Sequence, residues 1–182
     1  FRVDLVDPTA RPRTGPPRRY SQREREAADE FLDEALKKGL IAVSEHPSGA
    51  NLVFVPKTGP DGKQTGVRVC VNYTALNRNI RQFKAGVPHI DELLNRVAGA
   101  EAYSVVDFVC GFLQQGVEET SKRHTTFQTP HRGNFQWNVT PMGIASAPAY
   151  FSAMVARLLD AEINGRWETK PDGSVVQVVV PH

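Results

Sequence analysis

A short apolar run that ends in a single acid constrains this chain more than any other feature. The run covers Tyr103 to Gln115, Tyr-Ser-Val-Val-Asp-Phe-Val-Cys-Gly-Phe-Leu-Gln-Gln, in which Asp107 follows two β-branched residues and Gly111 interrupts the pattern. Burial of an unpaired carboxylate costs on the order of several kcal/mol. An Asp at the end of a buried strand therefore either caps the helix or turn that follows, or binds a divalent cation. In the second case the backbone N–H groups of Cys110 and Gly111 would face an anion.

The composition is that of an ordinary globular protein. The chain has 182 residues, of which 40% are apolar and 23% charged, and its net charge is +2. This length suits one domain or two small ones, and the charge neither indicates nor excludes a nucleic-acid partner. Cys70 and Cys110 lie in strand-like or core-like segments, which indicates reduced thiols inside a cell. We find no signal peptide, no apolar run near the ~18 residues of a membrane span, and no zinc-like spacing of Cys and His.

The first twenty residues are predicted to form an extended arm, because four prolines forbid a helix there. The arginines of this arm either keep it solvated or bring it against phosphate groups. A helix follows, since Ser21 and Glu24 have the spacing of a capping box and Gly39 ends the periodic segment. The apolar residues between them recur at helical spacing, which indicates packing rather than chemistry.

The remaining elements alternate between hairpins and helices. In chain order they are a hairpin of Leu52 to Val55, halted by Pro56, and Val67 to Val71; a helix of Ile90 to Val97; the strand before Asp107; a hairpin of Thr125 to Thr129 and Asn134 to Val139; a helix from Ser146 to Ile163; a polar loop of Asn164 to Gly173; and a strand of Val175 to Val180. This order predicts an α+β fold in which helices cover one face of an antiparallel sheet.

Cations gather on the first hairpin and just after it. Lys57, Lys63 and Arg68 lie on or beside the hairpin, where they form either a solvated face or a clamp for a polyphosphate. An irregular basic stretch with Arg78 and Arg81 follows.

Six different sequence blocks follow one another along nearly the whole chain. They are Glu34 to Ile41, Val69 to Asn77, Val87 to Leu94, Tyr103 to Gln115, Thr125 to Phe127, and Phe135 to Phe151. Together, in this order and at this spacing, they resemble the reverse transcriptase of long-terminal-repeat retrotransposons, most closely the Ty3/gypsy class. Each block alone has little specificity, whereas six in order have much.

The resemblance implies a right-hand polymerase, here its fingers and palm. It implies an arm at 1–20, fingers at 21–86 and 119–146, and a palm at 87–118 and 147–182 that is truncated before its end. It also implies RNA-directed DNA synthesis, in which a primer hydroxyl attacks a dNTP between two Mg²⁺ ions. The implied partners are an RNA or DNA template–primer, dNTP and the remainder of a retroelement polyprotein, but no membrane. The implied location is inside the cell, in the cytoplasm or in virus-like particles.

The resemblance also assigns roles to individual residues. Asp107 would be the first metal-binding carboxylate, and Phe108 would add its backbone carbonyl. The N–H groups of Cys110 and Gly111 would hold the triphosphate, and the ring of Phe112 would lie under the sugar and exclude a 2′-hydroxyl. The alternative for Phe112 is a place in the core. The further implied contacts are Met142 in the nucleotide pocket; Lys57, Lys63 and Arg68 on the phosphates; and Arg78, Arg81 and Lys84 on nucleic acid.

The chain also departs from the family pattern. Asn72 and Thr74 stand where the family usually has Asp and Arg, and His124 replaces a common Lys. The Asp-Asp turn that follows a strand like Val175 to Val180 is missing, because that strand runs into Pro181 and His182. Two hypotheses follow. The chain is a polymerase fragment that needs the rest of its palm, or it is a non-catalytic remnant with at most non-specific nucleic-acid affinity.

Overall fold

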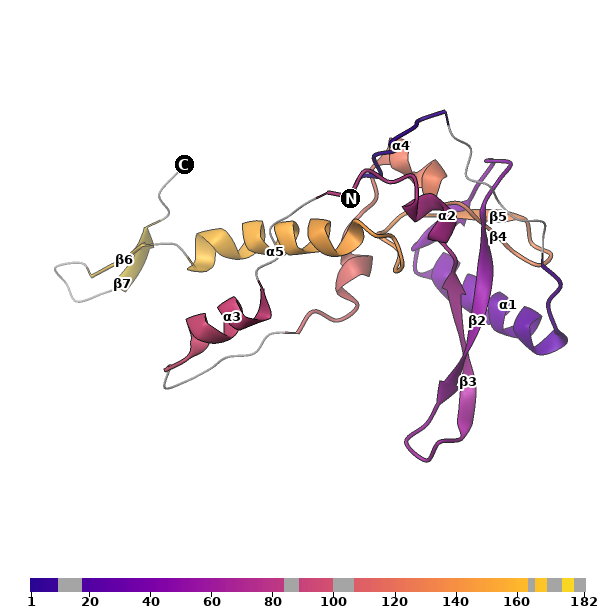
Figure 1. The fold of residues 1–182 in the computed structure, drawn as a ribbon, viewed down its shortest axis with the longest axis horizontal. Helices are drawn as coiled ribbons and strands as arrows, with labels where there is room; N and C mark the ends of the chain where they lie inside the picture. Colours follow the sequence, from indigo (N-terminus) through magenta and orange to yellow (C-terminus); the bar gives the residue numbers. More distant parts are fainter. Residues whose placement is uncertain (10–17, 84–88, 100–106, 164–165, 170–174, 179–182) are drawn as a thin grey trace.

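The computed structural model describes residues 1–9, 18–83, 89–99, 107–163, 166–169 and 175–178. Its elements are α1 (Gln22–Lys37), β1 (Ile41–Val43), β2 (Ala50–Thr58), β3 (Gln64–Val71), α2 (Thr74–Asn77), α3 (Ile90–Val97), η1 (Gly111–Gln114), α4 (Glu119–Lys122), η2 (Arg123–Thr125), β4 (Phe127–Gln128), β5 (Asn134–Trp137), α5 (Ala147–Ile163), β6 (Arg166–Thr169) and β7 (Val175–Val178). The α+β class is as predicted. Figure 1 shows α5 extending away from the main sheet, with the β6–β7 hairpin at its far end.

The main sheet has five strands in the order β1-β5-β4-β2-β3. Its pairs are antiparallel except for β2 and β4, which run parallel where Ala50 and Asn51 meet Phe127 and Gln128. Gly49 allows this approach, because a Cβ atom there would lie 2.8 Å from the carbonyl carbon of Phe127. The glycine is thus needed at the point where β2 joins the sheet.

The β2–β3 hairpin is longer than predicted. Its register runs from Leu52 opposite Val71 to Thr58 opposite Gln64, so Pro56 does not halt the strand. Beyond Asn51 the other edge of β2 pairs with no described strand. A proline on such an edge removes no ladder hydrogen bond on that side, which explains why the strand continues.

The helix α1 begins and ends as predicted, and it covers the core. The N–H of Glu24 donates to the hydroxyl oxygen of Ser21 at 3.3 Å, and the N–H of Ser21 donates to the Glu24 carboxylate at 2.7 Å. The face that α1 buries carries Ala28, Leu32 and Ala35. At the centre of the core is the fully buried ring of Phe127, whose aromatic neighbours are Phe31, Phe135 and Trp137.

Residues 1–9 do not form a solvated arm, which was one of the two alternatives for the arginine-rich segment. Val3 is buried, and its N–H donates to the hydroxyl oxygen of Ser121 at 3.0 Å. Leu5 forms an antiparallel bridge with Ile80. The apolar residues at alternate positions suit a short extended segment that packs on one side, so this part of the arm is a piece of the fold. Residues 10–17 lie outside the described residues.

Two strands were missed, and one prediction cannot be compared. β1, which pairs with β5, was not predicted. β6 lies inside the stretch predicted as a polar loop, and it pairs with β7 in the predicted strand of Val175 to Val180. Strands of three or four residues are too short to show a clear alternation, so pairing rather than pattern specifies them. The strand predicted before Asp107 lies outside the described residues. Among the described helices, none combines the length and hydropathy that a membrane span requires.

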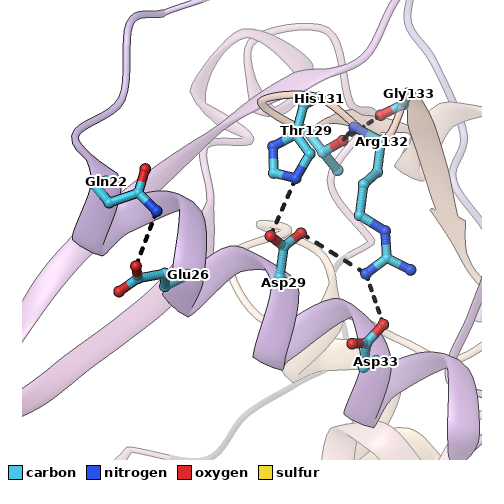
Figure 2. A network of polar contacts seen from close by, with 8 residues as sticks. All are labelled: Gln22, Glu26, Asp29, Asp33, Thr129, His131, Arg132 and Gly133. Carbon is cyan, nitrogen blue, oxygen red and sulfur yellow. Dashed lines mark hydrogen bonds and ion pairs between the residues drawn. The ribbon is translucent and has the colours of Figure 1, made fainter.

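A charged cluster ties α1 to the turn between β4 and β5, as Figure 2 shows. The guanidinium of Arg132 lies 2.6 Å from the carboxylate of Asp33 and 3.8 Å from that of Asp29. The Nε2 atom of His131 lies 3.1 Å from the other Asp29 oxygen. The hydroxyl of Thr129 donates to the carbonyl of Gly133 at 2.8 Å, which shapes the turn. The cluster thus fixes the hairpin tip on the helix.

Replacing Arg132 with Ala should lower the free energy of unfolding by about 1 kcal/mol, because it removes the cation from two carboxylates. One Asp29 oxygen is buried and makes no hydrogen bond, so it loses its nearest cation. Urea unfolding in low salt measures this loss, which should shrink in 1 M salt as screening increases. Glu26→Ala on the same helix breaks the exposed Gln22–Glu26 hydrogen bond and should have an effect near zero. Equal losses in both variants would contradict the role of the cluster.

Candidate functional site

Asp107 is exposed at the start of a described segment. The burial from which the sequence argument began is therefore not seen at this residue. The capping interpretation is not supported either. The N-cap of the following η1 is Cys110, and no side chain makes a capping hydrogen bond there. Its metal-binding role stays a prediction.

The turn that follows Asp107 presents backbone N–H groups. Cys110 has φ 51° and ψ 44°, the left-handed region that a non-glycine residue rarely adopts. The turn is closed by the N–H of Leu113, which donates to the carbonyl of Cys110 at 2.8 Å, and by the amide of Gln114, which donates to the carbonyl of Val109 at 2.7 Å. Within the described part of the chain, the N–H groups of Cys110 and Gly111 donate to no protein acceptor. Such adjacent free donors suit an anion.

An aromatic residue of α5 holds this turn in place. The ring of Phe151 meets Phe108 edge to face at 5.9 Å between centroids and Phe112 at 5.3 Å. A Cβ atom on Gly111 would lie 2.6 Å from the Cζ atom of Phe151, so the turn can pack this closely only with glycine there. Sequence reasoning placed Phe151 merely on the apolar face of its helix. Phe112 is half-buried against this ring, which agrees with its core alternative and leaves its role at a sugar as a prediction.

The loop between β5 and α5 is fastened on both sides. The N–H of Thr140 donates to the carbonyl of Gln115 at 2.8 Å, just after η1. The amide of Asn77 donates to the carbonyl of Gly143 at 2.8 Å and accepts from the N–H of Ala145 at 2.9 Å. Met142, which is 65% exposed, is therefore presented between η1 and α2. Asn77 was not predicted as a site residue. The signal that could have found it is its place as the last residue of the block Val69 to Asn77.

The predicted cations are spread over two elements. Lys57, Lys63 and Arg68 are exposed on the β2–β3 hairpin, with Arg68 paired opposite Val55. No described contact joins their side chains to the turn after Asp107. Arg78 lines a cavity beside α2, and the backbone N–H of Arg81 donates to the carbonyl of Asp4 at 2.8 Å. Lys84 lies outside the described residues.

The carboxylates of the described residues do not assemble a two-metal centre. Those residues contain no group of three or more His, Cys, Asp or Glu side chains that could hold a metal ion. Mg²⁺ needs near-ideal octahedral oxygen geometry, and a two-metal centre needs several anionic oxygens. Asp107 and one carbonyl therefore do not fit two Mg²⁺ ions.

Comparisons with known proteins identify the family of this chain. Residues 55–177 match the family model described as reverse transcriptase (RNA-dependent DNA polymerase). The enzymatic polyprotein of figwort mosaic virus (strain DxS) is 34% identical over 165 residues, which cover 90% of this chain and 23% of the polyprotein. That of carnation etched ring virus is 34% identical over 151 residues, which cover 82% and 22%. The chain thus spans less than a quarter of these relatives, and their kind does not confirm the Ty3/gypsy class.

Solved structures show the same fold. The crystal structure of a prototype foamy virus protease–reverse transcriptase mutant superposes with a TM-score of 0.72 at 23% identity, over 91% of this chain and 21% of that one. The foamy viral protease–reverse transcriptase in complex with an RNA/DNA hybrid gives 0.68 at 21% identity, over 99% and 23%. The described elements therefore share the fold of part of those chains.

Proposed function

Because this chain belongs to the reverse transcriptase (RNA-dependent DNA polymerase) family, we propose that it supplies the fingers and the first part of the palm of an RNA-directed DNA polymerase. The observation that carries this proposal is the turn after Asp107. Its two N–H groups donate to no acceptor among the described residues. The fit of Gly111 against Phe151 positions them, and the Met142 loop is fastened beside the turn. Adjacent N–H groups of this kind suit the phosphate oxygens of a triphosphate.

Each residue of the turn then has a role. The N–H groups of Cys110 and Gly111 would bind phosphate oxygens of a dNTP, and the ring of Phe112 would lie under its sugar. Met142 would line the same pocket. Asp107 and the carbonyl of Phe108 would contribute ligands to one Mg²⁺ ion at most, so the chemical step needs carboxylates beyond the described residues.

The proposed partners are nucleic acid and further polyprotein segments. Solved relatives are complexes with double-stranded DNA and with an RNA/DNA hybrid, and the viral relatives are polyproteins. We assign an RNA or DNA template–primer to this chain, with Lys57, Lys63 and Arg68 reaching phosphates from the exposed hairpin. Arg78, Arg81 and Lys84 would add contacts to the strands. A Ty3/gypsy-like retroelement polyprotein, in the cytoplasm or in virus-like particles, remains our proposal for its origin.

A second candidate function is binding without catalysis. In this alternative the chain is a retroelement remnant with at most non-specific nucleic-acid affinity. The two candidates share a binding surface and differ in chemistry, so primer extension by the whole polyprotein that contains this chain, and not by residues 1–182 alone, separates them.

The hairpin should bind primer–template mainly through phosphates. The logarithm of the binding constant should fall by about 0.9 per phosphate contact for each tenfold increase in salt concentration. The affinity should depend little on base sequence. Arg68→Gln should reduce the slope of the salt dependence by about 0.9, the value for one phosphate contact. Arg25→Gln, at an exposed position on α1, should leave the slope unchanged. Fluorescence anisotropy over a salt series measures both. Salt-independent or strongly sequence-selective binding would contradict the proposal.

A further inference from the structure

The first seven residues of the chain are bound to two segments that lie far apart in the sequence. We call residues 1–7 the strap. Along one side the strap pairs with residues 79–81, where the N–H of Val6 donates to the carbonyl of Asn79 at 2.8 Å. The side-chain amide of Asn79 donates to the carbonyl of Asp7 at 2.9 Å, and its oxygen accepts from the N–H of Asp7 at 3.0 Å. Asn79 therefore holds the strap by its backbone and by its side chain.

The other side of the strap is bound by residues 116–121. The backbone nitrogen of Phe1 donates to the carbonyl of Gly116 at 2.7 Å. The N–H of Val3 donates to the hydroxyl oxygen of Ser121 at 3.0 Å, and both of these residues are buried. In Figure 1 the start of the chain passes beside α4, the helix that contains Ser121. A buried donor that loses its acceptor is costly, so Ser121 anchors this end of the strap.

The two segments that the strap joins also hold the Met142 loop between them. Asn77 bonds to this loop on one side, and Gln115 bonds to it on the other. The hydrogen bonds therefore close a ring that runs from the strap through residues 77–81, the Met142 loop and residues 115–121 back to the strap. If the ring opened at the strap, its two sides could separate, and the loop would keep its bonds to one side only.

The strap also contacts the helix that positions the turn after Asp107. The ring of Phe1 meets that of Tyr150 edge to face, at 5.2 Å between centroids. Tyr150 precedes Phe151 on α5, and Phe151 packs against Gly111 in the turn. The strap is thus connected by direct contacts both to the Met142 loop and to the turn.

We propose that the strap is a positioning element of the nucleotide site. It sets the distance between the two segments that hold the Met142 loop, and so keeps the loop and the N–H groups of the turn in place for a dNTP. This inference deepens the proposed function and rests on it for the identity of the ligand. Proteins open in local units, so release of the strap should loosen the loop without unfolding the main sheet.

The test follows hydrogen exchange of backbone amides in residues 1–182 with the strap released at either end. Asn79→Ala removes one anchor of the strap, and Ser121→Ala removes the other. The reporters are the N–H groups of Thr140 and Ala145, which donate to Gln115 and Asn77 across the ring. We expect each variant to speed their exchange about fivefold, the ratio for one lost hydrogen bond, and to leave exchange in β2 and β3 unchanged.

The double variant shows whether the two anchors act through one strap. Once one end is released, loss of the second should add little, so exchange should again be about fivefold faster rather than about twenty-five-fold. The control is Asn134→Ala, the same substitution at another half-buried asparagine, which breaks a bond to the carbonyl of His46 outside the ring and should leave the loop unchanged. Additive effects of the two anchors, or equally faster exchange in β2 and β3, would overturn the inference.

A second measurement separates this inference from the proposed function. Binding of a fluorescent dNTP in Mg²⁺ should weaken several-fold in Asn79→Ala and in Ser121→Ala, and should be unchanged in Asn134→Ala. If all variants bind dNTP equally well although loop exchange has changed, the strap does not position the nucleotide site and the inference is wrong. If the unchanged chain binds no dNTP, the proposed function fails, whereas the exchange result still decides whether the strap holds the loop.

Discussion

Residues 1–182 should incorporate no nucleotide onto a primer, on RNA or DNA templates, with Mg²⁺ or Mn²⁺. Two-metal transfer needs anionic oxygens that hold both ions roughly 3.5–4 Å apart. The described residues offer Asp107 and the carbonyl of Phe108, and they contain no cluster of three metal-ligating side chains. Mg²⁺ sheds its waters reluctantly without such ligands. A primer-extension gel with a labelled primer measures the result, and a control polymerase shows that the template is competent.

Synthesis should appear when carboxylates are restored. We would replace Pro181 and His182 with two aspartates and append the rest of a related palm and thumb. Asp107→Asn in that protein should abolish extension. Asp91→Asn, an exposed residue on α3, removes the same charge and should leave extension intact. Asp107-dependent extension by residues 1–182 alone would show that the missing carboxylates have been placed wrongly.

The sequence predicted well those elements whose local signals agree with one another. For α1, the capping box at Ser21, the apolar spacing and Gly39 all indicate the same ends, and the helix begins and ends there. Pro56 misled because its effect depends on whether the strand edge is paired, which is a property of the sheet rather than of the local sequence. β1 was missed for the same reason, since a three-residue strand exists through its partner β5.

The candidate site was predicted as a set of residues but not as an arrangement. The motif around Asp107 identified the turn, in which the N–H groups of Cys110 and Gly111 donate to no acceptor among the described residues. Their role at a triphosphate stays a prediction. The contacts that hold the turn and the Met142 loop could not be predicted from local pattern. Phe151, which packs on Gly111, is forty residues after it, and Asn77, which fastens the loop, is thirty-four residues before it. The cavity beside α2 could not be predicted from local pattern either. Arg18, Arg78 and Arg123 converge only in the folded chain.

Gly111→Ala should lower the free energy of unfolding by about 1–3 kcal/mol, the usual cost of an overpacked contact. The new Cβ atom would lie 2.6 Å from the ring of Phe151 and 3.4 Å from the Cβ of Phe108. Gly111 is not among the glycines of positive φ, so crowding rather than backbone strain causes the loss. Gly66→Ala is the matched control, because its Cβ atom would meet Lys57 at an ordinary 3.7 Å.

A double-mutant cycle with Phe151→Leu tests the cause of that loss. Leucine lacks the ring edge that meets Gly111. Gly111→Ala should therefore lower the free energy of unfolding by well under ~1 kcal/mol in the Phe151→Leu background. The double mutant should therefore be more stable than the sum of the two single losses predicts, by an interaction energy on the order of 1–2 kcal/mol. Chemical denaturation of the four proteins measures it. If Gly111→Ala costs the same in both backgrounds, the turn does not depend on Phe151. The N–H groups proposed to bind phosphate would then be positioned by something other than α5.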